Sequence, residues 1–185
     1  MDAAPRKTRR TYNEPGHAHY LTFSCYRGLR LLSRDAPRRW FIEALAKARD
    51  RHAFDVHAYV IMLEHVHLLV RPRHAEYRMG VFLKAVKRPV SWNAKQRLTA
   101  SGNDVWLKRL TVRKGVRDVF RFWEAGGGFD RNLWKAEAVR EAVAYIHANP
   151  VRRGLVEKPT DWPWSSARFW AGLDGVLLPM DRIPV

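Results

Sequence analysis

Residues 55–71 read DVHAYVIMLEHVHLLVR, and this stretch decides the fold that the rest of the sequence has to match. Residues 55–62 and 65–71 are two short runs rich in β-branched and aromatic residues, a composition typical of strands. Leu63-Glu64 lies at their join, so we predict that the two runs pair as antiparallel strands.

Strand and helix periodicities on either side extend this pair into a domain. Residues 20–26 alternate as a strand does, with Leu21, Phe23 and Cys25 on one face. The same patterns predict a helix over 36–51, with Asp35 as N-cap and Pro37 in its first turn. They predict a second helix over 78–98, kinked or divided at Pro89, and a strand over 116–123. A last helix is predicted over 135–148, stopped by Pro150. The order β-α-β-β-α-β-α predicts an α+β fold: a ferredoxin-like antiparallel sheet with helices on one face and one extra C-terminal helix.

The elements group into one domain with two flanking segments. We predict a basic, loose arm over 1–17, a single domain over 18–172 and a C-terminal tail over 173–185. The glycine run at 126–128 is predicted to be a flexible join before the last helix.

Charge indicates the class of partner. The 185 residues include 34 Lys and Arg against 18 Asp and Glu, a formal net charge of +16. This excess favours a polyanionic partner, because Lys and Arg release counterions when they meet phosphates. An arginine-rich composition could account for the preference for Arg over Lys, but it does not account for the deficit of acids. We therefore expect a nucleic acid as partner.

Cysteine count and hydropathy limit the remaining classes. Cys25 is the single cysteine, which excludes an intramolecular disulfide and any multi-cysteine zinc site. Residues 1–10 are polar and basic, unlike a secretory signal, and the longest apolar runs are too short to span a bilayer. We expect a cytoplasmic protein, associated with the nucleoid and without a membrane partner.

His65 and His67 form a candidate metal-binding pair. Because residues i and i+2 of a strand face the same way, both imidazoles project from one side of the sheet. Two strand rises separate them by roughly 6–7 Å at the backbone, a span that two side chains can close onto one ion. Imidazole binds first-row metals and accepts manganese or magnesium when oxygen ligands complete the shell. Pairs of this spacing also occur by chance, and His57 on the neighbouring strand either joins them or packs beside Tyr59.

A second candidate lies in the last predicted helix. Tyr145 and Asn149 stand four residues apart and therefore share a helix face, whereas His147 points nearly the opposite way. A phenol beside a carboxamide oxygen suits a nucleophile next to a third metal ligand. By spacing alone, Tyr145 could equally be an ordinary residue of an amphipathic helix and Asn149 a cap before Pro150.

Three segments together resemble the REP-associated tyrosine transposases, which are single-tyrosine, single-strand transposases of the HUH superfamily. Residues 60–70 (VIMLEHVHLLV) resemble the family's histidine strand pair, and 145–156 (YIHANPVRRGLV) resemble its catalytic-tyrosine helix and the following turn. Residues 161–167 (DWPWSSA) resemble its tail signature. Phe122-Trp123 and the run GFDR at 128–131 match the segment before the tyrosine helix.

The resemblance runs from about residue 20 to 170 and implies a ferredoxin-like (RRM-like) fold. It implies that His65, His67 and Asn149 bind a divalent metal, Mg²⁺ or Mn²⁺. Tyr145 is then the nucleophile of a single-stranded DNA endonuclease and strand transferase that forms a covalent phosphotyrosine. The implied substrate is single-stranded DNA with hairpins from palindromic repeats, and we expect the protein to act on it as a monomer or homodimer.

The chain departs from the family in places. Leu63 stands where proline is expected and Glu64 where asparagine is frequent, both in the turn before the histidines. Residues 106–121 match poorly, and they either carry an insertion with DNA contacts of its own or form a divergent strand. Four aromatic residues either dock the tail onto the domain or stack on unpaired bases: Trp162, Trp164, Phe169 and Trp170.

If the cations serve DNA binding, they should gather at the cleft beside the histidine strand and the last helix. The candidates are Arg27, Lys84, Lys87, Arg88, Arg131, Arg152 and Arg153. Three other functions fit parts of the sequence: a host-adapted hairpin DNA-binding protein with little or no cleavage activity, an RNA-binding module, and a metallohydrolase that uses the histidines without Tyr145. An RNA-binding sheet of this kind carries aromatic residues where His65 and His67 stand, so their presence favours catalysis.

Overall fold

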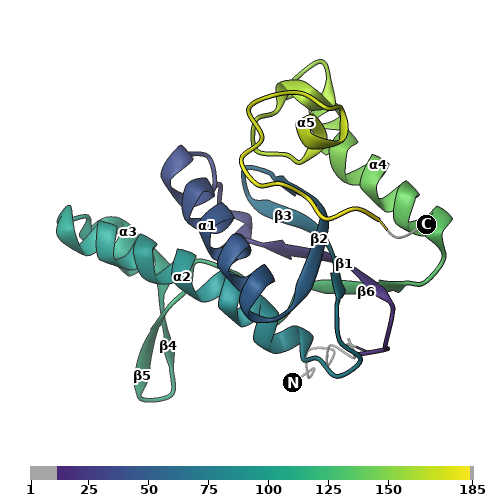
Figure 1. The fold of residues 1–185 in the computed structure, drawn as a ribbon. Coiled ribbons are helices and arrows are strands. Elements are labelled where there is room, and N and C mark those ends of the chain that lie inside the picture. The colour runs from purple at the N-terminus through teal and green to yellow at the C-terminus, as the bar shows by residue number, and fades with distance from the viewer. Residues whose placement is uncertain (1–11, 184–185) are drawn as a thin grey trace, which may run out of the picture.

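The computed structural model describes residues 12–183, and within that range four strands form one antiparallel sheet. Across the sheet the order is β2 (Phe54–Ile61), β3 (His65–Pro72), β1 (Ala18–Ser24) and β6 (Phe129–Leu133) (Figure 1). The predicted strand pair is confirmed as β2 and β3, in which Val60 lies opposite His67. The sheet and its helices confirm the predicted α+β fold.

Helices cover both faces of the sheet. The long ones in the described chain are α1 (Asp35–Arg51), α2 (Met79–Ala100) and α4 (Ala136–Arg152). α1 and α2 pack on one face, where Val66 and Leu68 are buried (Figure 1). α4 packs on the other face, against Val60 and Leu69. Because side chains alternate along a strand, His67 points to the face that α4 covers.

The first predicted strand and helix are present, with one correction at the helix start. β1 buries Phe23 on the face of α1 and α2, as the alternation predicts. α1 coincides with the first predicted helix, but Arg34 occupies the N-cap position and Asp35 is already helical, so the predicted cap is wrong. The Asp35 carboxylate instead lies 3.5 Å from Arg38, one turn further along.

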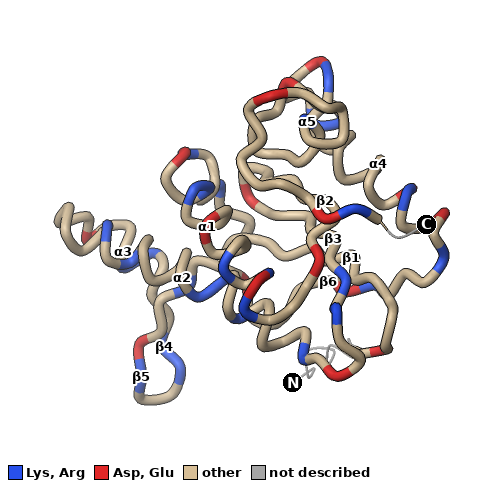
Figure 2. Tube along the Cα trace, viewed as in Figure 1, with Lys and Arg blue, Asp and Glu red and all other residues tan. Residues whose placement is uncertain are grey.

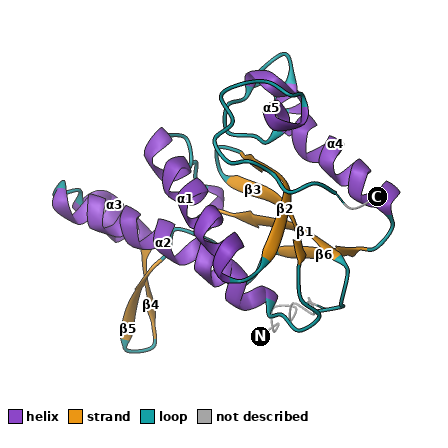
Figure 3. Ribbon diagram, in the orientation of Figure 1, coloured by secondary structure: helices purple, strands orange, loops and turns teal. Residues whose placement is uncertain are grey.

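The chain between α2 and β6 forms a short helix, α3 (Asp104–Leu110), followed by a projecting two-stranded ribbon. The strands of this ribbon are β4 (Thr111–Lys114) and β5 (Arg117–Phe120) (Figure 3). Over residues 12–183, β4 and β5 pair only with each other, so the strand predicted over 116–123 is wrong as a member of the sheet, and β6 takes that place. The reason is burial: Leu133 of β6 packs under α4, whereas none of the four residues of β5 is buried.

The predicted stop at Pro150 is wrong, and of the two outcomes predicted at Pro89, a kink or a division, the division is wrong. α2 continues through Pro89 as one helix, and α4 continues through Pro150 for two more residues. In α4 the missing N–H of Pro150 deprives the Ile146 carbonyl of its usual donor. The side-chain amide of Asn149 lies 3.5 Å from that oxygen and partly replaces the lost hydrogen bond.

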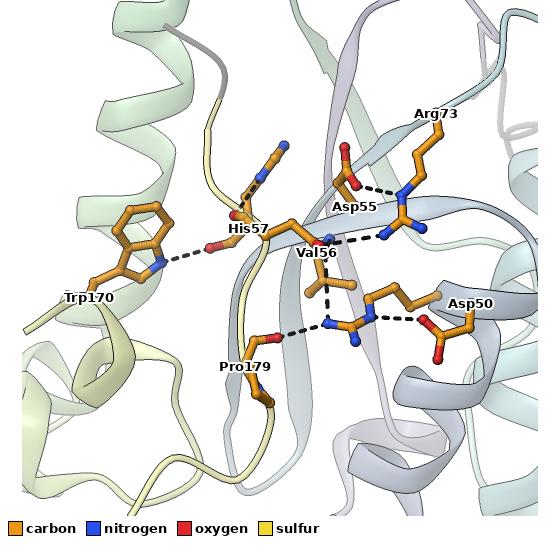
Figure 4. A network of polar contacts seen from close by, with 9 residues as sticks. Asp50, Asp55, Val56, His57, Arg73, Trp170 and Pro179 are labelled. Atoms are coloured by element: carbon orange, nitrogen blue, oxygen red, sulfur yellow. Dashed lines mark hydrogen bonds and ion pairs between the residues drawn. The ribbon is translucent and has the colours of Figure 1, made fainter. Parts of the chain in front are cut away.

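After α4 the chain runs back and docks on the edge of β2. Short helical turns along the chain are η1 (Tyr26–Gly28), η2 (Pro159–Asp161) and α5 (Ala167–Trp170). The Trp162 indole donates to the Ile61 carbonyl at 3.0 Å, and the Trp170 indole donates to the His57 carbonyl at 2.8 Å. The Asp181 carboxylate accepts a backbone N–H of β2 at 2.8 Å, within the polar network of Figure 4. These contacts favour docking over base stacking for the tail aromatics.

Most of the predicted basic arm over 1–17 lies outside the described residues, as do residues 184–185. Two carbonyls of the described part contact the domain: Tyr12 accepts from Asn132 at 2.9 Å, and Glu14 accepts from Tyr77 at 3.1 Å. Between residues 12 and 183, no helix combines the length and the apolar character needed to cross a bilayer.

Gly128→Ala should destabilise the fold by about 3 kcal/mol or more. Gly128 has a φ of 88° where the chain meets β1, and a Cβ there would overlap the Thr22 carbonyl oxygen, so this part of the predicted flexible join is a close packing contact. Gly126→Ala is the matched control: its φ is 87°, but nothing lies within 4 Å of its Cβ, so it should cost only about 1–2 kcal/mol of backbone strain. Urea unfolding measures both variants, and equal losses would show that the close approach has no effect on stability.

Candidate active site

His65 and His67 lie side by side at the start of β3, on the sheet face that α4 covers. Their Nε2 atoms are 3.1 Å apart, and their ring centroids are 4.8 Å apart. Val66 between them is fully buried on the opposite face, which keeps both imidazoles on this side. The spacing of two residues thus brings two ring nitrogens to one point.

The Nδ1 atom of each histidine already has a protein partner. Nδ1 of His65 lies 3.2 Å from a Glu64 carboxylate oxygen. Nδ1 of His67 lies 2.7 Å from the Tyr20 hydroxyl and 2.9 Å from the Thr22 hydroxyl. With Nδ1 as the donor, each ring presents the lone pair of Nε2. Burial lowers the pKa of both histidines, to about 3 for His67, which keeps them in the neutral, metal-binding form.

α4 brings Tyr145 and Asn149 to the histidines. The Tyr145 ring lies 5.9 Å from the His67 ring, edge to face, and is 43% exposed. Asn149 is buried, and its Nδ2 donates to the Tyr145 carbonyl at 2.8 Å, which turns Oδ1 the other way. Burial lowers the pKa of His67, and the Asn149 side chain opposes that effect. Because the Asn149 NH2 group is engaged by the helix backbone, its amide oxygen is the atom left to meet an ion at the histidines.

Packing on the far side of α4 holds this orientation. Ile146 is fully buried against the sheet, in the cluster that contains Val60 and Leu69. His147 points away from the histidine pair, as its spacing predicts, and its Nε2 lies 2.8 Å from the Ser166 hydroxyl in the docked tail. Burial lowers the pKa of His147 to about 4. The tail and the sheet together leave Tyr145 on the open side of the helix.

These residues fit a divalent metal ion. Two nitrogens bound at about 2.1 Å to one ion, at a right angle, would be about 3 Å apart, and the Nε2 atoms of His65 and His67 are 3.1 Å apart. In the part of the chain that the structure describes, no three His, Cys, Asp or Glu side chains cluster as ligands, so a third protein ligand has to be of another type. The Asn149 oxygen is such a group, and imidazole with oxygen ligands suits manganese or magnesium.

His57 contacts the tail and not the histidine pair. The register of β2 shifts between Val56 and Ala58, and Nδ1 of His57 lies 3.1 Å from the Asp181 carbonyl (Figure 4). Tyr59 is fully buried in the core between the sheet and α1 and α2. His57 therefore serves to dock the tail, and neither the interpretation as a metal ligand nor the one as a packing neighbour of Tyr59 describes it.

The predicted DNA-binding cations near the histidine face come from three elements. Arg131 on β6 lies opposite Tyr20, so it shares the face of the histidines. The Arg152 guanidinium lies 4.9 Å above the Tyr145 ring. Arg153 donates to the Glu64 carboxylate at 2.9 Å.

Arg27 follows β1, and its backbone N–H donates to Glu124 at 2.6 Å. Lys84, Lys87 and Arg88 belong to α2 and lie on the opposite side of the sheet. Lys87 makes internal contacts: its Nζ donates to the Gly126 carbonyl at 2.9 Å, and burial lowers its pKa to about 8. Figure 2 shows Lys and Arg spread over several elements. The gathering of these cations into a DNA-binding cleft stays a prediction.

Two residues beside the site escaped sequence analysis. Tyr20 and Thr22 alternate with the buried residues of β1, a signal that places them on the open face of that strand. Their contact with His67 depends on the pairing of β1 with β3, which sets Thr22 opposite His67. Phe129 of β6 also lies here, 43% exposed, with its ring 6.1 Å from that of Tyr20.

Comparison with known proteins identifies one relative by sequence and one solved structure with the same fold. No family model matches the chain. A REP-associated tyrosine transposase of Escherichia coli (strain K12) is 24% identical over 140 residues, which are 75% of this chain and 68% of the relative. A solved structure of a REP-associated tyrosine transposase bound to a REP hairpin matches with a TM-score of 0.67 at 20% identity, over 97% of this chain and 95% of that one. The resemblance inferred from the sequence motifs is confirmed, and the fold is shared with that structure.

Proposed function

We propose that this chain acts as the REP-associated tyrosine transposases do, as a metal-dependent single-stranded DNA endonuclease and strand transferase with Tyr145 as nucleophile. One observation carries the proposal: β3 presents two histidine Nε2 atoms 3.1 Å apart, and α4 presents Tyr145 and Asn149 beside them. A nucleophile next to a metal site is what phosphotyrosine chemistry requires. The sequence relation to a transposase supports the transposase family.

The proposed substrate is single-stranded DNA that carries hairpins from palindromic repeats. His65, His67 and Asn149 would hold Mg²⁺ or Mn²⁺, which when bound polarises the scissile phosphate and stabilises the charge of the transition state. The Tyr145 oxygen bonds to phosphorus while the bond from phosphorus to one deoxyribose oxygen breaks. The phenol loses its proton, and the leaving oxygen takes up a proton to become a hydroxyl group. The phosphotyrosine keeps the bond energy, so a second deoxyribose hydroxyl can displace Tyr145 and rejoin the strand.

Arg152 adds positive charge where the phenol and the phosphate meet. Its guanidinium lies 4.9 Å above the Tyr145 ring, at the open side of the helix. A cation in this position stabilises negative charge as it develops on the phenol oxygen and attracts the phosphate to it.

We expect the protein to cleave and rejoin DNA at the nucleoid, as a monomer or homodimer.

The main alternative is a host-adapted hairpin DNA-binding protein with little or no cleavage activity. The solved structure with the same fold is bound to a REP hairpin, and hairpin binding alone would be enough for this alternative. Against it, Tyr145, His65 and His67 are all chemically competent and lie together. A metallohydrolase that ignores Tyr145 would have no use for a phenol 5.9 Å from the histidine ring.

The experiment that tests this function is incubation with hairpin-bearing single-stranded DNA, with and without Mn²⁺ or Mg²⁺. A denaturing gel should show a covalent protein–DNA band that depends on the metal. Tight hairpin binding without such a band under any divalent metal would support the hairpin-binding alternative. Cleavage without a covalent band would indicate a metallohydrolase.

Glu64→Ala should weaken Mn²⁺ binding about tenfold. The Glu64 carboxylate lies 3.2 Å from Nδ1 of His65 and 2.9 Å from Arg153, so it orients the ring and ties it to the end of α4. Glu64→Gln keeps an accepting oxygen and should lose less. The measurement is Mn²⁺ titration followed by electron paramagnetic resonance, with Glu124→Ala as a control that removes a carboxylate engaged elsewhere, at the Arg27 backbone. Equal Mn²⁺ affinity in Glu64→Ala and the wild type would remove this role.

A further inference from the structure

The exposed face of α2 carries a pattern that the proposed active site does not use. Lys84, Arg88, Trp92 and Lys95 follow one another at spacings of three or four residues, and all four are exposed. Trp92 is 61% exposed, although indole rings are usually buried or partnered. α2 packs on the opposite face of the sheet from His67 (Figure 1), so this surface is separate from the candidate active site.

Carboxylates are missing from this part of the chain. Residues 77–103 contain six Lys and Arg and no Asp or Glu. Among the ion pairs of the described residues, none involves Lys84, Arg88 or Lys95. Like charges one helical turn apart repel each other, whereas a merely solvated helix usually mixes the two signs. A bound polyanion would relieve this repulsion.

A groove lies beside the same face, between α2 and the segment that follows β5. It encloses about 420 Å³, with Lys84 and Arg88 on the helix side and Arg121 on the other. Glu124 also lines it and accepts the Arg27 backbone N–H at 2.6 Å, so one negative charge stands against those of Lys84, Lys87, Arg88 and Arg121. Cations on two sides of a shallow groove suit a phosphate group.

The ribbon of β4 and β5 extends this cationic surface, since Arg121 comes directly after β5. Lys114 and Arg117 stand opposite each other in its register and so share a face. Like charges directly opposite each other destabilise a strand pair. On the other face, Arg113 is neutralised by Asp118 at 3.2 Å. The ribbon therefore has one balanced face and one cationic face.

We propose that the exposed face of α2, its groove and the ribbon form a second DNA-binding surface, which holds the substrate strand away from Tyr145. Lys84, Arg88 and Arg121 contact phosphates, and Trp92 stacks on an unpaired base. Single-stranded DNA is the occupant that fits, because an exposed indole among unpaired cations matches a strand that presents both phosphates and free bases. The identity of the strand as substrate rests on the proposed function, but the binding does not require cleavage.

The test uses the full chain in a Tyr145→Phe background, so that binding is measured without strand cleavage. Fluorescence anisotropy with the hairpin-bearing single-stranded DNA compares two double variants. Lys84→Ala/Arg88→Ala removes one exposed Lys and one exposed Arg from α2, and the control Lys135→Ala/Arg140→Ala removes one of each at the start of α4. A second pair compares Trp92→Ala with Trp134→Ala, a tryptophan that is 67% exposed elsewhere. Circular dichroism checks that each variant is folded.

Lys84→Ala/Arg88→Ala should weaken binding about tenfold and reduce the salt slope of log affinity by about 1.4, the value for two phosphate contacts on a single strand. Trp92→Ala should weaken binding about tenfold with an unchanged salt slope. The control variants should stay within about twofold. Equal losses in test and control variants, no DNA binding by the parent, or equally tight binding of polyglutamate would each overturn the surface. Absence of a covalent band with the wild type would count against the proposed function alone.

Discussion

Tyr145→Phe is expected to lower DNA cleavage by about four orders of magnitude or more while hairpin binding and folding persist. The substitution removes one oxygen and keeps the ring, which contacts His67 and Tyr20 edge to face and lies under Arg152. The ring is 43% exposed, so little burial depends on the hydroxyl. Without the phenol oxygen, the hydroxyls left beside the histidines are those of Tyr20 and Thr22, and both are engaged at Nδ1 of His67. The proposed bond to phosphorus is then not formed.

Denaturing-gel cleavage of the hairpin substrate, with anisotropy in parallel, measures this effect. Tyr20→Phe is the matched control, because it removes a phenol oxygen that contacts His67 from the neighbouring strand. That variant should keep a covalent band, at a reduced rate. Undiminished cleavage in Tyr145→Phe would exclude this tyrosine from the mechanism, and loss of the band in Tyr20→Phe alone would move the nucleophile to β1.

His67→Ala is expected to lower cleavage by about 10²–10³-fold at low metal concentration, with partial recovery as Mn²⁺ is raised. The change removes one of the two Nε2 atoms that lie 3.1 Å apart and leaves the Tyr20 and Thr22 hydroxyls without their ring partner. The remaining ligands bind the ion more weakly, so more metal restores occupancy. Tyr145→Phe should show no such recovery, because metal cannot replace a nucleophile.

A manganese titration of cleavage, with Mn²⁺ affinity measured by electron paramagnetic resonance, separates the two variants. His74→Ala is the control, since His74 is an exposed histidine outside the site. It should bind Mn²⁺ and cleave DNA as the wild type does. Wild-type Mn²⁺ affinity in His67→Ala would show that the ion, if it binds, binds elsewhere.

Local periodicity was enough to pair the chemically important side chains. The alternation of a strand put His65 and His67 on one face, and the turn of a helix put Tyr145 and Asn149 on another. Both relations depend on residues two or four positions apart, and backbone geometry alone dictates them. The apolar pattern likewise identified β1, β2, β3, α1, α2 and α4.

The choice of the fourth strand was not open to such reasoning. Residues 116–123 have β-forming residues, but β5 pairs with β4 outside the sheet, and none of its four residues is buried. β6 has a weaker strand pattern and still takes the place beside β1, because Leu133 can bury under α4 and Asp130 can bond to His19 at 2.8 Å. Burial by partners far along the chain outweighed local propensity.

By itself, then, the sequence determined which side chains share a strand face or a helix face, since those relations are set within one turn or two strand positions. Only the tertiary structure decided that the face of Tyr145 meets the face of His67, that Tyr20 and Thr22 hold the histidine ring, and that α2 carries its cations to the other side of the sheet. The first two of these relations join residues 45 to 78 positions apart. They depend on strand register and on which helix covers which face, and the free energy of burying the whole core sets both.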